Sequence, residues 1–341
     1  MKRLKIALIT LASLAGAASA QTLINGAGAT FPEPMYTKWF SEFKKSHPNV
    51  QINYTANGSG AGIKAVTEGT VDFGASDAIL TDQQLNDFKT NHGFPVLTFP
   101  TVMGAVVVTY NVAGVTGDLK LTPDAIAGIY LGKITKWNDA ALTKANPGVN
   151  LPNKDIVVVH RSDASGTSFV FTDYLSKISP EWKMKVGAAA SVSWPVGLAG
   201  PKNEGVAGLV KQQANSIGYV ELIYAVQNKM NYALVQNASM AFVKASLESV
   251  TAAAAASLKA IPDNLPQVSI TNAPGKDSYP ISTFTWLLIP QQIKDAGKKK
   301  GITDFLTWML KDGQGMTSAL TYAPLPKAVL DKEVKLIATI K

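Results

Sequence analysis

Apolar and polar positions follow two different periods along this chain of 341 residues. In residues 35–43 the aromatic and methionine side chains recur at helical spacing, which predicts a helix with one buried face. Residues 50–54 alternate apolar and polar side chains, as a half-buried strand does. A helix followed at once by a strand is typical of a protein with α/β layers.

Short runs rich in β-branched residues predict strands that are buried on both faces of a sheet. Three such runs are AVVVTY at 105–110, IVVVH at 156–160 and ISTFTWLLI at 281–289. Helical segments are expected at 247–258, at 303–310 and from 326 onward. Because strands and helices alternate, the fold class is predicted to be α/β, with mainly parallel sheets.

The length predicts two domains, at roughly 150 residues per domain. Apolar residues make up 46% of the chain and charged residues 16%, so a large core can form. No repeat or low-complexity linker divides the sequence, and the domains are therefore expected to be joined by closely packed crossings. Residues 99–104 and 274–281, both rich in Pro or Gly, are the candidates for these crossings.

The first twenty residues have the pattern of a cleavable signal peptide. Three basic residues within the first five positions precede an uncharged apolar run at 6–17, and small residues then lead up to Ala20. An anchor helix is the alternative, although a membrane span takes about 20 apolar residues. Cleavage after Ala20 would leave a chain that has no cysteine for a lipid anchor, so we expect a free periplasmic protein.

The net charge of +8 falls to +5 when the three cations of the signal peptide are removed (8 − 3). A basic protein can bind nucleic acid, a membrane or small anions. Export from the cytoplasm argues against nucleic acid, and the lysines are scattered apart from one dense run at 298–300, which is typical of a solvated helix end. The charge therefore mildly favours the attraction of small anions.

Two glycine-rich segments stand between a predicted strand and a predicted helix. GAGATFP at 26–32 places Thr30 at such a junction, and NGSGAG at 57–62 places Ser59 there. A helix N-terminus directs free N–H groups and the positive end of the helix dipole toward one point, which favours an anion. Taken alone, each segment is a weak signal, and an ordinary turn with a helix cap is the alternative.

Two further segments contribute charged side chains. RSDASGTS at 161–168 combines a guanidinium, hydroxyls, a glycine and a helix start, and Asp163 is positioned to hold Arg161 in place. Arginine recognises oxyanions through two parallel hydrogen bonds. DFGASD at 72–77 ends in Asp77, which could instead cap a helix.

The carboxylate of Asp77 is unexpected beside so many donors to an anion. A carboxylate can face an oxyanion only if that anion still carries a proton to donate. Phosphate does so near neutral pH, whereas sulfate does not. An unpaired carboxylate would reject sulfate, because a buried polar group without a partner is costly.

At these residues the chain resembles the periplasmic phosphate-binding protein of the bacterial high-affinity phosphate ABC transporter. The matching pieces, in the family's order, are GAGATFP (26–32), GSGAG (58–62), VDFGASDA (71–78), FPTVMGAVV (99–107), IYLGKITKWND (129–139), RSDASGTSFVFTDYL (161–175) and IGYVE (217–221). Residues 225–274 depart most from the family. The resemblance implies an α/β, two-domain class II periplasmic-binding-protein fold with two hinge crossovers and a ligand cleft between the domains.

The resemblance also implies domain boundaries and site residues. After the signal peptide at 1–20, domain one would comprise residues 21–104 plus 279–341, and domain two residues 105–278. The phosphate-binding residues would be Thr30, Phe31, Ser59, Asp77, Arg161, Asp163, Ser165, Gly166 and Thr167. The first three would donate hydrogen bonds, Phe31 through its backbone, and the last three would donate from a helix start. Asp77 would accept the phosphate proton, and Asp163 would orient Arg161.

The expected function is capture of inorganic phosphate, without chemistry, for an inner-membrane ABC permease. The protein is expected to act as a monomer and to use no cofactor and no metal. A phosphate-ester hydrolase is one rival, but it would need clustered metal ligands or a nucleophile beside a base, and the three histidines lie far apart in sequence. A receptor for sulfate, molybdate or an organic phosphate is another, against which Asp77 counts.

Overall fold

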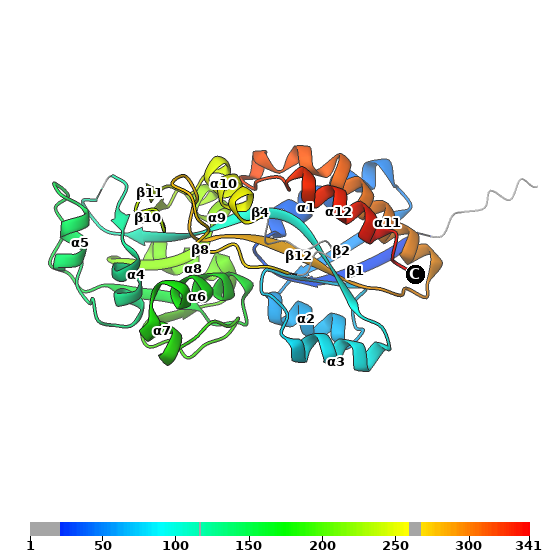
Figure 1. The fold of residues 1–341 in the computed structure, drawn as a ribbon, viewed down its shortest axis with the longest axis horizontal. Coiled ribbons are helices and arrows are strands. Elements are labelled where there is room, and N and C mark those ends of the chain that lie inside the picture. Colours follow the sequence, from blue (N-terminus) through cyan, green and yellow to red (C-terminus); the bar gives the residue numbers. More distant parts are fainter. Residues whose placement is uncertain (1–20, 116, 259–266) are drawn as a thin grey trace, which may run out of the picture.

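The computed structural model describes residues 21–115, 117–258 and 267–341, and its helices and strands form two lobes that lie side by side (Figure 1). The first lobe contains both the beginning and the end of the described chain. Its elements are β1 (Thr22–Gly28), α1 (Glu33–Ser46), β2 (Val50–Ala56), α2 (Ser59–Thr67), β3 (Phe73–Ser76), α3 (Asp82–His92), α11 (Ala296–Lys311), the 3-10 turns η2 (Gly313–Met316) and η3 (Ser318–Leu320), and α12 (Lys327–Ile337).

The middle of the chain builds the second lobe, which lies at the left of Figure 1. Its elements are β5 (Lys120–Leu121), α4 (Pro123–Tyr130), α5 (Ala140–Ala145), β6 (Val157–Arg161), α6 (Gly166–Ile178), α7 (Pro180–Lys185), β7 (Leu198–Gly200), α8 (Lys202–Gln212), β8 (Ser216–Glu221), α9 (Leu222–Gln227), β9 (Asn231–Tyr232), β10 (Leu234–Gln236) and β11 (Phe242–Val243). Helix α10 (Leu247–Ser257) lies over the junction of the lobes.

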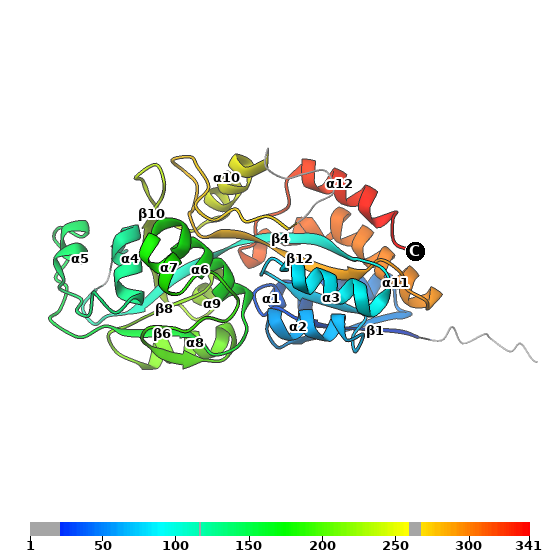
Figure 2. The ribbon, with the colours of Figure 1, turned by 60° about the horizontal axis from the view of Figure 1, so that its bottom comes forward.

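Two long strands join the lobes, β4 (Val96–Asn111) and β12 (Ser282–Pro290), and Figure 2 shows both running between them. The main sheet has the order β2-β1-β3-β12-β4-β8-β6-β7, with β9 also paired to β4. The first part of β4 pairs with β12, and from Val106 onward it pairs with β8. The two sides of the molecule are therefore parts of one continuous hydrogen-bonded sheet.

The outer strands are parallel, and the central ones are not. Strands β1, β2 and β3 run parallel, as do β6, β7 and β8. In contrast, β12 is antiparallel to β3 and β4, and β4 is antiparallel to β8. The prediction of mainly parallel sheets is thus confirmed within each lobe and wrong at the junction, where the chain crosses and returns.

Residues 99–104, which were expected to be a crossing because of Pro100 and Gly104, lie inside β4. Proline cannot donate to a strand ladder and is rare in a central strand. It is accommodated here because the register of the partner strand shifts between Thr285 and Trp286, and Trp286 lies opposite Pro100. The crossing is thus a buried strand with a local irregularity.

The predicted aromatic helix is confirmed as α1, which packs the first lobe's core. Its residues Met35, Tyr36, Trp39 and Phe43 are fully buried, and the ring of Phe40 packs at tilted or edge-on angles against aromatic rings of β2, β3 and α11. Burying one such side chain contributes roughly 1.5–3 kcal/mol. Because α1 begins directly after the loop that contains Thr30 and Phe31, this packing also fixes the position of that loop.

Within the described residues, no helix combines the length and apolar character that crossing a membrane requires. The predicted signal peptide at 1–20 lies outside the described residues.

The first testable prediction concerns Gly62, which brings α2 against β1 and β3. A Cβ at Gly62 would lie 2.5 Å from Gly28 Cα and 2.6 Å from the carbonyl oxygen of Ala27, both backbone atoms. We therefore expect Gly62→Ala to lower the free energy of unfolding by about 1–3 kcal/mol or more. Urea denaturation measures this change.

The matched control is Gly208→Ala in α8, where an added Cβ meets nothing within 4 Å. This change should be neutral or should stabilise by up to about 1 kcal/mol, because alanine favours a helix. Equal stability of the two variants would contradict the close packing at Gly62.

Candidate anion-binding site

The candidate residues follow the carboxyl ends of four parallel strands from both lobes. Thr30 and Phe31 follow β1, Ser59 follows β2, Asp77 follows β3, and the segment 161–167 begins at the end of β6. The carboxyl ends of parallel strands are where α/β sheets bind ligands. The structure therefore places all four predicted segments in the region where binding is expected.

The four segments meet at the contact between the lobes. A Cβ at Gly166 would lie 2.4 Å from Asp77 Oδ2 and 2.5 Å from Ser59 Oγ, so the start of α6 is close to both side chains. The backbone N–H of Gly60 donates to the carbonyl of Ala164 across the lobes at 2.9 Å. Thr30, Ser59, Asp77, Arg161, Ser165 and Thr167 are each at most 3% exposed.

Arg161 is the cation of this cluster and is held rigidly. Its Nε donates to Asp163 Oδ1 at 2.8 Å and its Nη2 donates to Asp163 Oδ2 at 2.5 Å. Burial alone would raise the pKa of Asp163, but the hydrogen bonds and charge of Arg161 outweigh it and lower that pKa. Arg161 Nη1 is buried and has no hydrogen-bond partner among the described residues. A buried guanidinium N–H without an acceptor is costly, and an anion would supply that acceptor.

Asp77 is the acidic member of the cluster and is 1% exposed. Its Oδ1 accepts a hydrogen bond of 2.6 Å from Thr285 Oγ1, and its backbone N–H donates to Ser59 Oγ at 3.3 Å. Burial raises the pKa of Asp77 to about 7, against the opposing effects of Thr285, Arg161 and Ser59. This carboxyl group can therefore gain or lose a proton near neutral pH.

Helix α6 presents its N-terminus to the same place. Ser165 is the N-cap, and its Oγ accepts from the N–H of Ser168 at 3.1 Å, which leaves its hydroxyl proton for another acceptor. The backbone N–H of Ser165 already donates to the carbonyl of Ala190 at 2.8 Å. Gly166 and Thr167 begin the helix, where backbone N–H groups have no acceptor within the helix.

Three tyrosines fix the loop between β1 and α1. The hydroxyls of Tyr54, Tyr224 and Tyr322 donate to the carbonyls of Ala29, Thr30 and Phe31, at 2.7, 2.6 and 2.6 Å respectively. In a planar trans peptide the carbonyl and the next N–H point in opposite directions. Holding the carbonyls of Ala29 and Thr30 therefore directs the N–H groups of Thr30 and Phe31 away from the tyrosines.

Sequence reasoning missed several residues that support this arrangement. Asn203 contacts the hydroxyls of Thr30 and Thr167, and Thr285 contacts Asp77. Glu221 is fully buried at the end of β8, and burial holds its pKa well above the usual range. Glu221 could have been noticed as the only acid in an otherwise neutral strand, SIGYVE. Asn203 and Thr285 carry no such local signal.

The histidine nearest to the site in sequence has other contacts. His160 stacks on Trp194, with ring centroids 4.9 Å apart, and its Nδ1 lies 3.0 Å from the carbonyl oxygen of Arg161. Over the described ranges, no three His, Cys, Asp or Glu side chains gather so that they could hold a metal ion.

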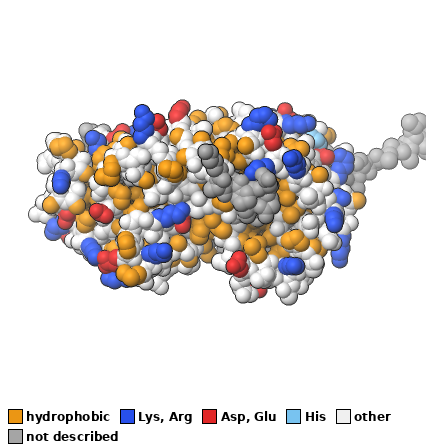
Figure 3. Space-filling view, viewed as in Figure 1, with side chains coloured by type: hydrophobic (Ala, Val, Ile, Leu, Met, Phe, Trp, Pro, Cys, Tyr) orange, Lys and Arg blue, Asp and Glu red, His pale blue; other side chains and the backbone are white. Residues whose placement is uncertain are grey.

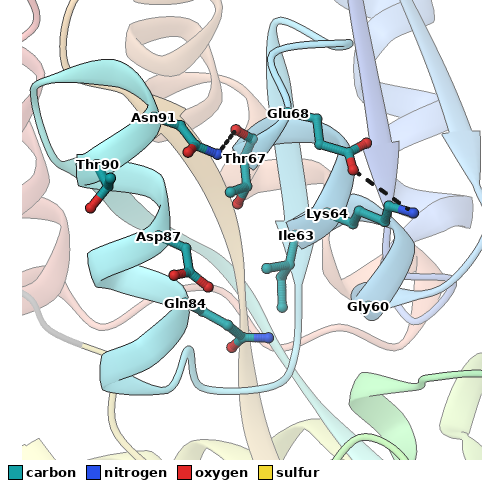
Figure 4. A pocket seen from close by; sticks show the side chains of 9 residues that line it. All are labelled: Gly60, Ile63, Lys64, Thr67, Glu68, Gln84, Asp87, Thr90 and Asn91. Carbon is teal, nitrogen blue, oxygen red and sulfur yellow. Dashed lines mark hydrogen bonds and ion pairs between the residues drawn. The ribbon is translucent and has the colours of Figure 1, made fainter.

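The molecular surface is indented in more than one place. The outline of the molecule is notched between the lobe with α6 and α7 and the lobe with α2 and α3 (Figure 3). A separate hollow of about 390 Å³ lies between α2 and α3, where Lys64 pairs with Glu68 and Asn91 donates to the carbonyl of Thr67 (Figure 4). The one lysine of this hollow is already paired with an acid. The hollow therefore lacks the excess of hydrogen-bond donors that the candidate residues at the contact between the lobes provide.

Comparison with known proteins gives consistent matches. A family model described as a PBP superfamily domain matches residues 15–312. The chain is 46% identical over 304 residues to the phosphate-binding protein PstS of Xylella fastidiosa (strain Temecula1), covering 89% of this chain and 81% of that protein. It is 42% identical over 332 residues to the PstS of Pasteurella multocida (strain Pm70), covering 97% and 94%. A phosphate-binding protein from Stenotrophomonas maltophilia has a TM-score of 0.72 at 22% identity and covers 93% of each chain. The predicted two-domain α/β fold is confirmed.

The raised pKa of Asp77 predicts how stability depends on pH. Without an anion, the folded protein keeps a proton on Asp77 up to about pH 7, whereas the unfolded chain releases it near the ordinary pKa of 3.8. Stability of the native sequence should therefore fall as the pH rises through this window. Asp77→Asn removes this titratable group. The thermal unfolding midpoint of the variant, relative to that of the unsubstituted protein, should therefore rise between about pH 5 and about pH 8.

The measurement is thermal unfolding after exhaustive dialysis into buffers free of phosphate and sulfate. A difference between the two midpoints that is the same at both pH values would contradict the titration of Asp77 in this window.

Proposed function

Because the chain belongs to the PstS phosphate-binding proteins of the PBP superfamily, we propose that it binds inorganic phosphate between its lobes as the substrate-binding component of a phosphate ABC importer. The observation that carries this proposal is a buried cluster with many donors and one acceptor. Arg161 Nη1 lacks an acceptor, and burial raises the pKa of Asp77 to about 7, so its carboxylate form is favoured when a proton donor lies beside it. Phosphate satisfies both groups at once, because it has unprotonated oxygens and a P–OH group.

The assigned residues would share the anion between the lobes. Thr30, Phe31 and Ser59 would donate from the first lobe, and Asp77 would accept the phosphate proton. Arg161, oriented by Asp163, would provide the charged contact from the second lobe. Ser165 would donate its hydroxyl, and Gly166 and Thr167 their N–H groups, with the hydroxyl of Thr167 as well.

Binding would stabilise the closed arrangement of the two lobes. Donors from both lobes converge on one anion, so the anion binds the closed state better than any open one, and this difference shifts the population toward closure. We assign residues 21–104 plus 279–341 to domain one and 105–278 to domain two. The pair β4 and β12 would serve as the hinge, since both strands run from one lobe to the other.

The remaining proposals concern the cellular setting. The protein would be exported through a signal peptide at 1–20, cleaved after Ala20, and would act in the periplasm as a monomer. It would deliver phosphate to an inner-membrane ABC permease that recognises the closed shape. It would release the phosphate unchanged, since Ser59 and Ser165 serve as hydrogen-bond donors in this arrangement and not as nucleophiles.

Calorimetric titration of phosphate into the ligand-free protein tests the proposed function. We expect phosphate to bind at least about a thousandfold more tightly than sulfate near pH 8, because sulfate leaves the carboxylate of Asp77 without a proton donor. Sulfate binding of equal strength, or no heat of binding with phosphate, would refute the proposal.

Asp77→Asn should relax the rejection of sulfate. The amide of asparagine can donate to an unprotonated oxygen, so the ratio of sulfate to phosphate dissociation constants should fall by about tenfold or more. Competition titrations of both anions against the variant measure this ratio. Thr285→Val provides a control that removes one contact to Asp77 and leaves the carboxylate in place, and it should keep most of the discrimination. Unchanged discrimination in Asp77→Asn would exclude Asp77 as the acceptor.

A further inference from the structure

Asn203 lies at the start of α8 and connects the two lobes through two hydroxyl groups. Its side chain is fully buried. Nδ2 is 2.9 Å from Thr30 Oγ1, in the first lobe, and 3.3 Å from Thr167 Oγ1, in the second lobe. Both threonines are among the proposed phosphate ligands. A buried amide therefore contacts two residues of the anion site without being one of the proposed ligands itself.

The orientation of this amide is fixed by a backbone group. The N–H of Glu221 donates to Asn203 Oδ1 at 3.0 Å. A backbone N–H can only donate, so the atom facing it must be the oxygen, and the NH₂ group must face the two threonines. The amide has two N–H bonds, one for each hydroxyl oxygen. Asn203 is therefore a donor to both threonines.

A hydroxyl that accepts from Asn203 must direct its own proton elsewhere. Local backbone acceptors are restricted, since the carbonyl of Thr30 already accepts from Tyr224 and Thr167 lies in the first turn of α6, where no helical carbonyl precedes it. The remaining direction is toward the anion. Freely rotating hydroxyls would have to give up alternative orientations when the anion binds.

We propose that Asn203 is a positioning residue that commits the hydroxyl protons of Thr30 and Thr167 to the bound anion. This inference rests on the proposed function and adds a determinant of affinity that does not touch phosphate itself. Because Thr30 and Asn203 lie in different lobes, the bond between them forms only when the lobes are together. Orientation of the Thr30 hydroxyl is therefore completed by closure.

The test uses Asn203→Ala and Asn203→Asp in calorimetric titrations with inorganic phosphate. Asn203→Ala frees both hydroxyls and should weaken binding by about tenfold. Asn203→Asp keeps the acceptor for Glu221 but draws both hydroxyl protons toward its carboxylate, and should weaken binding by about a hundredfold or more. Thermal unfolding of each variant establishes that it is folded.

A double-mutant cycle separates positioning from a general structural effect. In a Thr30→Val/Thr167→Val background there are no hydroxyls to orient, so Asn203→Ala should change phosphate affinity by less than about twofold. Asn146→Ala is the matched control, because Asn146 is also a buried amide, with Nδ2 bonds of 2.9 and 2.8 Å to the carbonyls of Lys120 and Leu142. It should leave phosphate affinity unchanged.

The outcomes distinguish the two proposals. If the unsubstituted protein does not bind phosphate, the proposed function fails. If it binds phosphate but Asn203→Ala binds equally well, the role of Asn203 is refuted. An equal loss in the native and the valine backgrounds also refutes it, since the effect would then not act through the hydroxyls.

Discussion

The structure depends on how the charge and the hydrogen-bond donors of one buried guanidinium group are satisfied. Arg161 is almost fully buried, and removing such a charge from water is costly unless its donors are satisfied. Asp163 satisfies Nε and Nη2, but it leaves Nη1 without an acceptor in the described residues. The protein thus neutralises the cation's charge, and in the proposed site the remaining hydrogen-bonding capacity would be available to the anion. The surrounding hydroxyls and helix N-terminus add further donors to the same place.

The sheet makes this compensation possible by bringing donors from two lobes together. Strand β4 pairs with β12 in the first lobe and with β8 in the second, and the change of partner falls at Val106. Glu221, Tyr279 and Ile281 all contact β4 at this residue. The loops with Thr30 and Arg161 lie on opposite sides of this junction. A small rotation at the junction would therefore open or close the whole donor set.

Much of the fold, and the segments that build most of the candidate site, could be predicted because their signals are local. The aromatic spacing of α1, the β-branched strands and the glycine-rich strand ends all follow from neighbouring residues. The continuity of β4 could not be predicted, since Pro100 reads as a break and only the register shift at Thr285 accommodates it. The roles of Asn203 and Tyr224 could not be predicted for a related reason: each contacts Thr30, which is more than 170 positions away in sequence and meets them only where the lobes touch.

In the proposed site, selectivity would reside in the acceptor more than in the donors. Hydroxyls, N–H groups and a guanidinium would serve any oxyanion of suitable size. The pKa of Asp77, raised to about 7 by burial, lies in the range where phosphate itself exchanges a proton. One proton can therefore be shared between Asp77 and phosphate, whether the carboxyl group or the phosphate carries it before binding. A fully deprotonated anion brings none, so Asp77 must first take one from water, and this becomes more costly as the pH rises above about 7. In the proposed site, burial of a single carboxyl group would thus convert a general anion site into one that selects a protonated oxyanion.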